Sequence, residues 1–276
     1  MDISVNINGK PADITFEDEK TVEDLLVGIS AWLRESESSI TAVTIDGKYI
    51  NSITLQDVFE KELADIKQID ITVSSWQEVA LEALYGIKKD MQDYVRGSFK
   101  EREEMRKLWD GSVIAKFFED QMPDLFQYIK NVFLGDGLLA DSIDKIIDER
   151  IYEIIEPIAE LKCMGDSVSE VAALLEDIPL DIQTGKDDKA AVTIQRFSHV
   201  TEKLFRLIRL LKLQDSDLDK VSIDDIPLYN FIDEYRSALR ELVSAYEVRD
   251  AVLVGDLAEY ELSPRLLKLY AALTRG

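Results

Sequence analysis

Carboxylates alternate along the segment Asp215–Asp219, as they do at the start of a calcium-binding loop. Such a loop also needs a glycine at its sharp turn and a bidentate glutamate at its end. Lys220 stands at the glycine position, and Ile226 stands at the glutamate position. The segment therefore favours a solvated acidic loop over a metal site, and no metal ligands are predicted in the chain.

Two glycine-containing segments resemble parts of nucleotide-binding loops. Gln183–Lys186 matches the end of a phosphate-binding P-loop, but Leu180 stands where the earlier glycine is required. Gly135–Gly137 lacks the third glycine and the preceding strand of a dinucleotide-binding motif. Both segments are therefore interpreted as connections between helices, and no cofactor is predicted.

The chain contains one histidine, His199, and one cysteine, Cys163. Glu202 lies one helical turn from His199, but this local pair lacks the nucleophile of a catalytic triad. A single histidine cannot supply the two Glu-x-x-His motifs of a di-iron bundle. Cys163 has no second cysteine for a redox motif, and we expect it to be a buried small residue near a helix end. The sequence therefore predicts no catalytic residues.

Basic side chains recur at every third position in one apolar segment of this acidic protein: Lys203, Arg206, Arg209 and Lys212. One interpretation is a docking helix for an acidic partner or for another copy of the chain. That interpretation makes these four residues the candidate partner-binding site. The alternative, which we favour, is a central bundle helix whose basic edge contacts acidic neighbours such as residues 215–225.

The overall charge narrows the classes of partner. The 276 residues include 55 acidic and 32 basic side chains, which give a formal net charge of −23. A field of this sign repels phosphate backbones and anionic membranes, so we predict no nucleic-acid binding. No apolar stretch reaches the roughly 18 residues of a membrane span, so no membrane insertion is predicted. The single cysteine cannot form an intrachain disulfide, and residues 1–10 lack a signal-peptide pattern, which predicts a cytoplasmic location.

Residues 1–75 have the patterns of strands around one helix. The apolar positions of the expected strands are Ile3, Val5, Ile7, Ala12, Ile14, Phe16, Val43, Ile45, Ile69, Ile71 and Val73. Asn8–Gly9 and Asp46–Gly47 are strong signals for tight turns. Thr21, with Asp24 three residues later, predicts a capped helix start. The apolar stripe of that helix consists of Val22, Leu25, Leu26, Ile29, Trp32 and Leu33.

This order of hairpin, helix, strand, short turn and strand resembles the β-grasp fold of ubiquitin-like domains and of sulfur-carrier proteins. The resemblance covers about the first quarter of the chain and rests on pattern and length. Those modifier and carrier families end in a free glycine pair, whereas here the last strand continues through Ser74–Ser75. The resemblance therefore implies a binding module rather than a conjugated modifier or a sulfur carrier.

The outward positions of the expected sheet are polar or acidic, unlike the apolar patch on the sheet of ubiquitin. They are Ser4, Asn6, Asn8, Asp13, Thr15, Glu17, Thr44, Asp70 and Thr72. We therefore expect any partner of this face to be hydrophilic or basic. An apolar open face would show that the assigned register is wrong by one residue.

From Ser75 onward the apolar period changes from two residues to about 3.6. Ser75 and Glu78 form a capping-box pattern for a helix that we predict to run to about Trp109. Pro123 predicts a kink or a new helix start, and Pro157 predicts a bend within a helix that runs from Leu138 to Cys163.

Ser263–Pro264 has the residue types of a further helix start, and residues 178–188 are predicted to be a loop. No strand pattern and no fixed repeat are found after residue 75. We therefore predict a bundle of about six helices in this part of the chain.

The predicted fold class is α+β, with a β-grasp (ubiquitin-like) domain at 1–75 followed by an all-α helical bundle at 76–276. The predicted function is that of a non-catalytic cytosolic adaptor or scaffold that binds another protein through either domain. One alternative is an enzyme or small-ligand-binding protein with a site assembled in the bundle. The tyrosines that could contribute to it are Tyr85, Tyr94, Tyr128, Tyr152 and Tyr246. A structural homo-oligomer is a third alternative.

Overall fold

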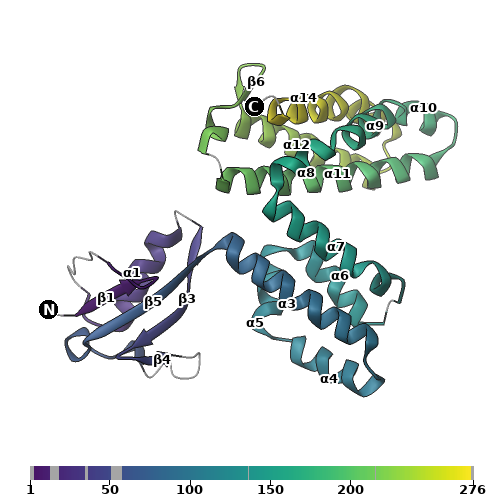
Figure 1. Cartoon of the computed structure of the whole chain (residues 1–276). Helices are drawn as coiled ribbons and strands as arrows, with labels where there is room; N and C mark the ends of the chain where they lie inside the picture. Colours follow the sequence, from purple (N-terminus) through teal and green to yellow (C-terminus); the bar gives the residue numbers. More distant parts are fainter. Residues whose placement is uncertain are drawn as a thin grey trace. The chain divides into compact units, whose positions relative to one another are not determined.

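The chain folds into two compact units, Met1–Asp148 and Glu149–Gly276. The computed structural model describes residues 3–12, 19–34, 37–50, 58–135, 137–214 and 216–274 (Figure 1). A mixed sheet is followed by helices, so the predicted α+β class is confirmed. The first unit contains both the sheet and several helices. The predicted domain limits, 1–75 and 76–276, stay a prediction.

Five strands of the first unit form one mixed sheet. They are β1 (Ser4–Ile7), β2 (Lys10–Pro11), β3 (Ser38–Ile45), β4 (Lys48–Ile50) and β5 (Gln68–Ser75), in the spatial order β2-β1-β5-β3-β4. β1 and β5 run parallel, and the other neighbours are antiparallel. Asn8–Gly9 and Asp46–Gly47 make the two predicted tight turns, with positive φ at all four residues.

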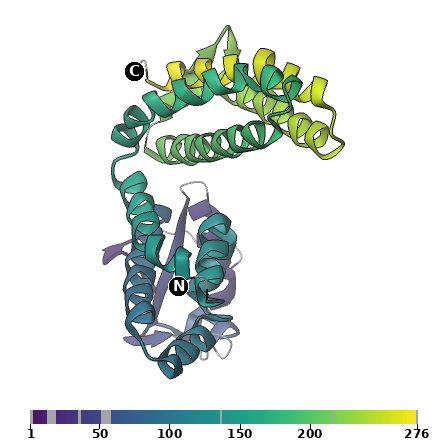
Figure 2. The same cartoon turned by 90° about the vertical axis from the view of Figure 1, so that its right-hand side faces the viewer.

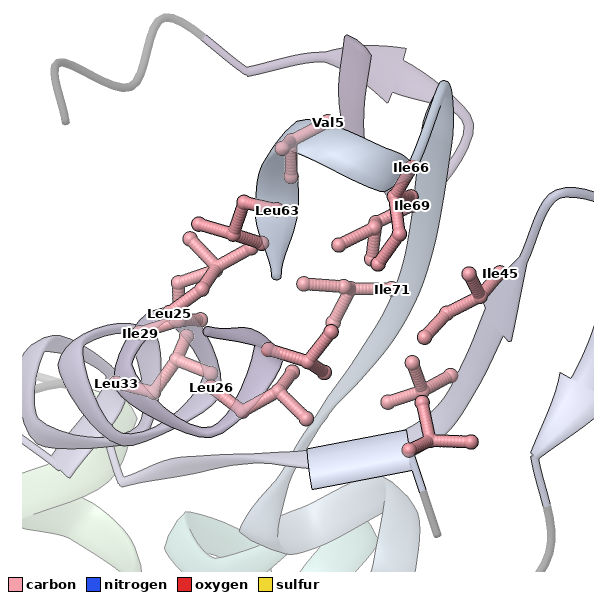
Figure 3. Packing of buried hydrophobic residues seen from close by; sticks show 13 residues of the cluster. Val5, Leu25, Leu26, Ile29, Leu33, Ile45, Leu63, Ile66, Ile69 and Ile71 are labelled. Carbon is pink, nitrogen blue, oxygen red and sulfur yellow. The ribbon is translucent and has the colours of Figure 1, made fainter. Parts of the chain in front are cut away.

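One face of the sheet and the helix α1 (Val22–Arg34) enclose an apolar core (Figure 3). The sheet contributes Val5, Ile45, Ile69 and Ile71, and each of these side chains is buried. The described outward positions are half-buried or exposed, so the predicted register is confirmed for them. Ile14, Phe16, Asp13, Thr15 and Glu17 lie outside the described residues.

The stripe of α1 was predicted correctly except at one position. Val22, Leu25, Leu26, Ile29 and Leu33 are buried, but Trp32 is exposed. Trp32 lies at the edge of the stripe, about 100° around the helix from Leu33, so it points away from the sheet.

Helices follow the sheet without an intervening linker. They are α3 (Trp76–Arg96), α4 (Phe99–Trp109), α5 (Val113–Gln121), α6 (Pro123–Phe133) and α7 (Gly137–Ile155). Ser75 and Glu78 form the predicted capping box at the start of α3. The prediction that this helix continues to Trp109 was wrong, because it ends at Gly97 and a second capping box, Ser98 with Glu101, starts α4. At Gly97 the start of a new helix is therefore favoured over the continuation of α3.

The second unit contains the end of α7 and the following elements, in which α11 is a helix of 28 residues. They are α8 (Pro157–Cys163), α9 (Gly165–Glu176), α10 (Ile178–Gln183), α11 (Asp187–Gln214), η2 (Ser216–Lys220), β6 (Ser222–Ile223), β7 (Ile226–Pro227), α12 (Leu228–Glu247), α13 (Ala251–Asp256), the π-helix η3 (Leu257–Leu262) and α14 (Ser263–Thr274). α11 packs against α8, α9 and α10 (Figure 2).

Two predictions for this unit were wrong. The residues 178–188, predicted to be a loop, contain the short helix α10, because Pro179 occupies its first turn, where a missing N–H costs no hydrogen bond. A two-stranded hairpin, β6–β7, lies in the part predicted to be wholly helical. Its turn is Asp224–Asp225, where both residues have positive φ although neither is asparagine or glycine, so the sequence carries no strong hairpin signal here. The predicted new helix start at Pro123 is confirmed, whereas at Pro157 the structure has a separate helix, α8, in place of the predicted bend.

Candidate functional site

A groove of about 440 Å³ lies between α11 and α12 in the second unit. Its lining on α11 is Ile194, Phe197, Ser198, Thr201, Glu202 and Phe205. Its lining on α12 is Leu239, Leu242, Val243, Tyr246 and Glu247. On both helices these positions recur at i, i+3, i+4 and i+7, so each helix contributes one continuous face. We call this surface the α11–α12 groove.

Aromatic rings hold the floor of the groove in place. The Tyr235 ring on α12 packs at nearly right angles to the rings of Phe197 and Phe205 on α11, with centroids 6.4 and 5.8 Å apart. Phe197 and Tyr235 are fully buried. Large side chains at a contact increase the distance between two helix axes, so these rings leave a hollow beside them.

A buried hydroxyl pair, Thr201 with Tyr235, belongs to this floor. The hydroxyl groups of Thr201 and Tyr235 form a hydrogen bond of 3.2 Å. Burial raises the pKa of Tyr235, and the hydrogen bond with Thr201 opposes that effect only partly. The phenol is therefore neutral and satisfied, and it acts as packing rather than as a proton-transfer group.

The charged residues that line the groove are both acidic, Glu202 on α11 and Glu247 on α12. Val243 and Tyr246 are about half exposed, with 57% and 49% of their surface accessible. The site thus combines an apolar floor, exposed apolar walls and an acidic rim. Such a surface binds apolar groups by removing them from water.

A second hollow of about 500 Å³ continues the groove, because Ile194 and Tyr246 line both. Its further lining is Ile182, Asp187, Ala190, Arg249, Ala251 and Val254. Along α11 the two hollows together extend from Asp187 to Phe205. At 1.5 Å per residue this corresponds to about 27 Å of helix.

The four basic residues predicted as a partner-binding site have two different environments. Arg206 donates through Nε and Nη2 to the two carboxylate oxygens of Glu153, at 3.0 and 3.1 Å. Lys203 forms ion pairs with Glu149 and Glu160. These two cations therefore bind acidic residues of α7 and α8, whereas the sequence predicted contacts with the acidic residues 215–225.

Arg209 and Lys212 are exposed on the same helix. The Lys212 ammonium lies 4.5 Å from the centre of the Tyr229 ring. The binding of a partner by these four residues stays a prediction.

Burial and ion pairing act in opposite directions on the pKa of Glu149. Burial raises it, but the hydrogen bond and charge of Lys203, with the charges of Arg150 and Arg206, bring it below its ordinary value of 4.5. The unfolded chain therefore binds more protons than the folded chain near that pH. Stability from this group is present above about pH 4.5 and lost as the pH falls further.

We expect Lys203→Met to make the acid-induced loss of stability of the second unit shallower between about pH 4.5 and pH 3, because the pKa of Glu149 returns toward its ordinary value. Urea denaturation at a series of pH values, followed by circular dichroism, measures this slope. Lys220→Met is the control, because its ion pair with Asp217 is exposed. Equal slopes for both variants would contradict the expectation.

The remaining sequence candidates do not gather into a site. In the part of the chain that the structure describes, no three His, Cys, Asp or Glu side chains are placed to hold a metal ion. Asp217 pairs with Lys220, and Asp215 lies outside the described residues. His199 is exposed on α11 and does not line the groove.

Cys163 is exposed, so the prediction of a buried residue was wrong. The helix α8 buries Pro157 and Leu161. Cys163 follows Leu161 by two residues, which places it about 200° around the helix, away from that buried face.

The tyrosines proposed for a small-ligand pocket are dispersed. Tyr85, Tyr94 and Tyr128 belong to the first unit, where Tyr94 donates a hydrogen bond to the Phe133 carbonyl. Tyr152 and Tyr246 belong to the second unit, and Tyr246 lines the groove. The wall residue Val243 was not predicted from the sequence, although the 3.6-residue apolar period of α12 could have indicated its face.

Two family models match parts of the chain. Residues 3–75 match a model described as the TP0873 N-terminal domain. Residues 161–272 match a domain of unknown function, DUF8042. The second match includes α9 to α13, so all residues that line the α11–α12 groove lie within it.

A protein of Treponema pallidum (strain Nichols), described as an uncharacterized protein, is 22% identical over 262 residues. The similarity covers 95% of this chain and 92% of that protein. No solved structure matches the chain. Among the described residues, no helix combines the length and apolar character that a bilayer crossing requires.

Proposed function

We propose that this chain is a non-catalytic cytosolic adaptor or scaffold that binds another protein through the α11–α12 groove. The observation that carries the proposal is the pair of helix faces that line this groove and leave apolar walls exposed at Val243 and Tyr246. Contiguous exposed apolar surface with a polar rim is typical of protein interaction sites. The single cysteine supports a reducing compartment.

The N-terminal sheet supplies a second surface of different character. The spatial order β2-β1-β5-β3-β4, with β1 parallel to β5, supports the resemblance to ubiquitin-like β-grasp domains. On its open face, Asn6 and Gln68 donate hydrogen bonds to the carboxylate of Asp70. These bonds, first that of Asn6 and then that of Gln68, lower the pKa of Asp70. A basic or hydrophilic partner would fit this face, and it would differ from the partner of the groove.

The small-ligand alternative has one observation in its favour. The two hollows, of about 440 and 500 Å³, fall within the range of roughly 300–1,000 Å³ of small-molecule sites. The groove, however, runs along two helices, and most of its lining side chains are apolar. These features favour a macromolecular partner over a small substrate.

A photo-crosslinking residue, p-benzoylphenylalanine, placed at Val243 tests the proposal. The full chain carrying it would be irradiated in an extract of the organism that encodes it. The matched control carries the same residue at Val192, which is 55% exposed on α11 and does not line the groove. We expect a crosslinked protein of defined mass from position 243 that position 192 does not give.

Three results would contradict the adaptor function. Crosslinks of equal pattern at both positions would indicate non-specific contact. Crosslinks from position 243 to the chain itself would indicate a homo-oligomer. A small molecule co-purifying with the chain, and lost when Val243 is replaced by aspartate, would favour the small-ligand alternative.

A further inference from the structure

We propose that the occupant of the α11–α12 groove is an amphipathic helix of a partner protein, with basic side chains beside its apolar stripe. This inference rests on the proposed function and names the chemistry of the partner. It is carried by the shape of the groove, by its length and by the charge at its rim.

The shape of the groove is that of a missing third helix. Its two walls are single faces of α11 and α12, each with lining residues at i, i+3, i+4 and i+7. A groove between two helix faces accepts the apolar ridge of a third helix, whose anchors repeat at the same spacing. A partner that binds as an added β-strand would instead need the free backbone edge of a sheet, which these helix walls do not offer.

The combined length of the α11–α12 groove and of the hollow that continues it sets the size of the occupant. The lining on α11 extends from Asp187 to Phe205, about 27 Å at 1.5 Å per residue. A helix of about 18 residues, or five turns, has this length. A single acyl chain or a small aromatic ligand would fill one hollow and leave the other open.

The negative charge at the rim of the groove favours a positively charged partner segment. Glu202 and Glu247 lie on opposite walls, and within the described ranges neither carboxylate has an ion-pair or hydrogen-bond partner. Asp187 adds a third carboxylate at the continuation of the groove, where Arg249 is the basic lining residue. The whole chain has a net charge of −23, which adds long-range attraction for a cationic segment.

A second copy of this chain is the less suitable occupant. In a two-fold symmetric dimer the same patch meets itself. The Glu202 and Glu247 rims would then lie close to their own copies, and like charges placed together oppose association. A basic helix from a different protein removes this repulsion and covers the same apolar walls.

The test uses a designed peptide as the probe and the full chain as the receptor. The probe is an 18-residue capped helix with leucine at i, i+3, i+4 and i+7 and lysine on either side of that stripe, a length taken from the estimate of about five turns. One comparison peptide has the same composition without the period, and another has glutamate in place of lysine. Titration by fluorescence anisotropy at about 0.15 M salt limits non-specific attraction.

The receptor variants come in matched pairs. Val243→Asp changes an exposed wall residue, and Val192→Asp makes the same change at similar exposure outside the groove. Glu202→Gln/Glu247→Gln removes the rim charge. Glu234→Gln/Glu241→Gln removes two exposed carboxylates of α12 that do not line the groove. Circular dichroism checks that each variant keeps its helices.

We expect the periodic basic peptide to bind at least about tenfold more tightly than either comparison peptide, a difference of about 1.4 kcal/mol. Val243→Asp should weaken this binding about tenfold, and the rim variant should weaken it about threefold, whereas both control variants should change it less than twofold. Equal binding of the peptide without the period, equal binding of the acidic peptide, or no effect of Val243→Asp would each overturn the inference.

The inference and the proposed function can fail separately. If position 243 crosslinks to a partner through a segment that is not a basic amphipathic helix, the adaptor function stands and this inference is wrong. If the peptide results are as expected but no protein crosslinks from position 243, the groove chemistry stands and the adaptor function is wrong.

Discussion

Glu153→Ala is expected to lower the free energy of unfolding of the second unit by about 3–5 kcal/mol. The Glu153 side chain is almost completely buried and accepts hydrogen bonds from two arginines. Arg206 binds it as a fork with two parallel bonds, and Arg150 donates through Nη1 at 3.1 Å. Removal of the carboxylate breaks the bonds that Glu153 makes to both guanidinium groups at a largely buried position, and breaking a buried ion pair is strongly destabilising.

The matched control is Glu170→Ala. Glu170 and Arg196 form an ion pair of 2.7 Å, but both side chains are more than half exposed. Exposed pairs contribute about 0–1 kcal/mol, so this variant should change stability little. All three tryptophans, Trp32, Trp76 and Trp109, lie in the first unit. Hydrogen exchange of α11 peptides therefore reports the second unit more directly than tryptophan fluorescence. Equal effects of the two variants would contradict the buried network.

A combined variant separates loss of charge compensation from loss of packing. Glu153→Met with Arg206→Met replaces the fork by two apolar side chains. Such replacements are often neutral or stabilising, so we expect it to be more stable than Glu153→Ala alone. A combined variant that is less stable than Glu153→Ala would show that the network contributes net stability.

The same network shows that the four basic residues of α11 have two different environments. From the sequence, Lys203, Arg206, Arg209 and Lys212 are equivalent members of one pattern. In the structure, the first two contact acidic residues of α7 and α8, about 40 to 50 residues earlier in the chain, and the last two are exposed. Periodicity defines which residues share a helix face, but the neighbouring helix decides what that face contacts.

The sheet could be predicted from the sequence more completely than the helices. Alternation with a period of two and the turns Asn8–Gly9 and Asp46–Gly47 are local signals, and they define both strand ends and the buried face. The break at Gly97 is less evident, because an isolated glycine can continue a helix at a cost of about 1 kcal/mol. Only the competing capping box of Ser98 and Glu101 makes the new start favourable there.

The groove could not have been assigned from the sequence. Leu242 and Val243 are adjacent apolar residues of α12, yet the first is buried and the second is 57% exposed. Helix periodicity places these two residues about 100° apart, but the hollow beside Val243 depends on the aromatic packing between α11 and α12, which is a property of tertiary structure. The acidic residues Glu202 and Glu247 become a common rim only through that packing.

Ile71→Ala is the second variant with a large expected effect, a loss of about 2–5 kcal/mol in the first unit. Ile71 lies on the central strand β5, between β1 and β3, and its side chain is 1% exposed against α1 (Figure 3). Deletion of its methyl groups removes apolar contacts and leaves a cavity that a sheet paired on both sides cannot close. Thermal denaturation and hydrogen exchange of β5 peptides measure the loss.

Thr72→Ala is the matched control for the register of the sheet. Thr72 follows Ile71 directly, points to the opposite face and is exposed. Its replacement should change stability by no more than about 0.5 kcal/mol. A large effect at Thr72 and a small one at Ile71 would show that the strand is displaced by one residue. The polar open face, and with it the expectation of a hydrophilic or basic partner there, would then also be wrong.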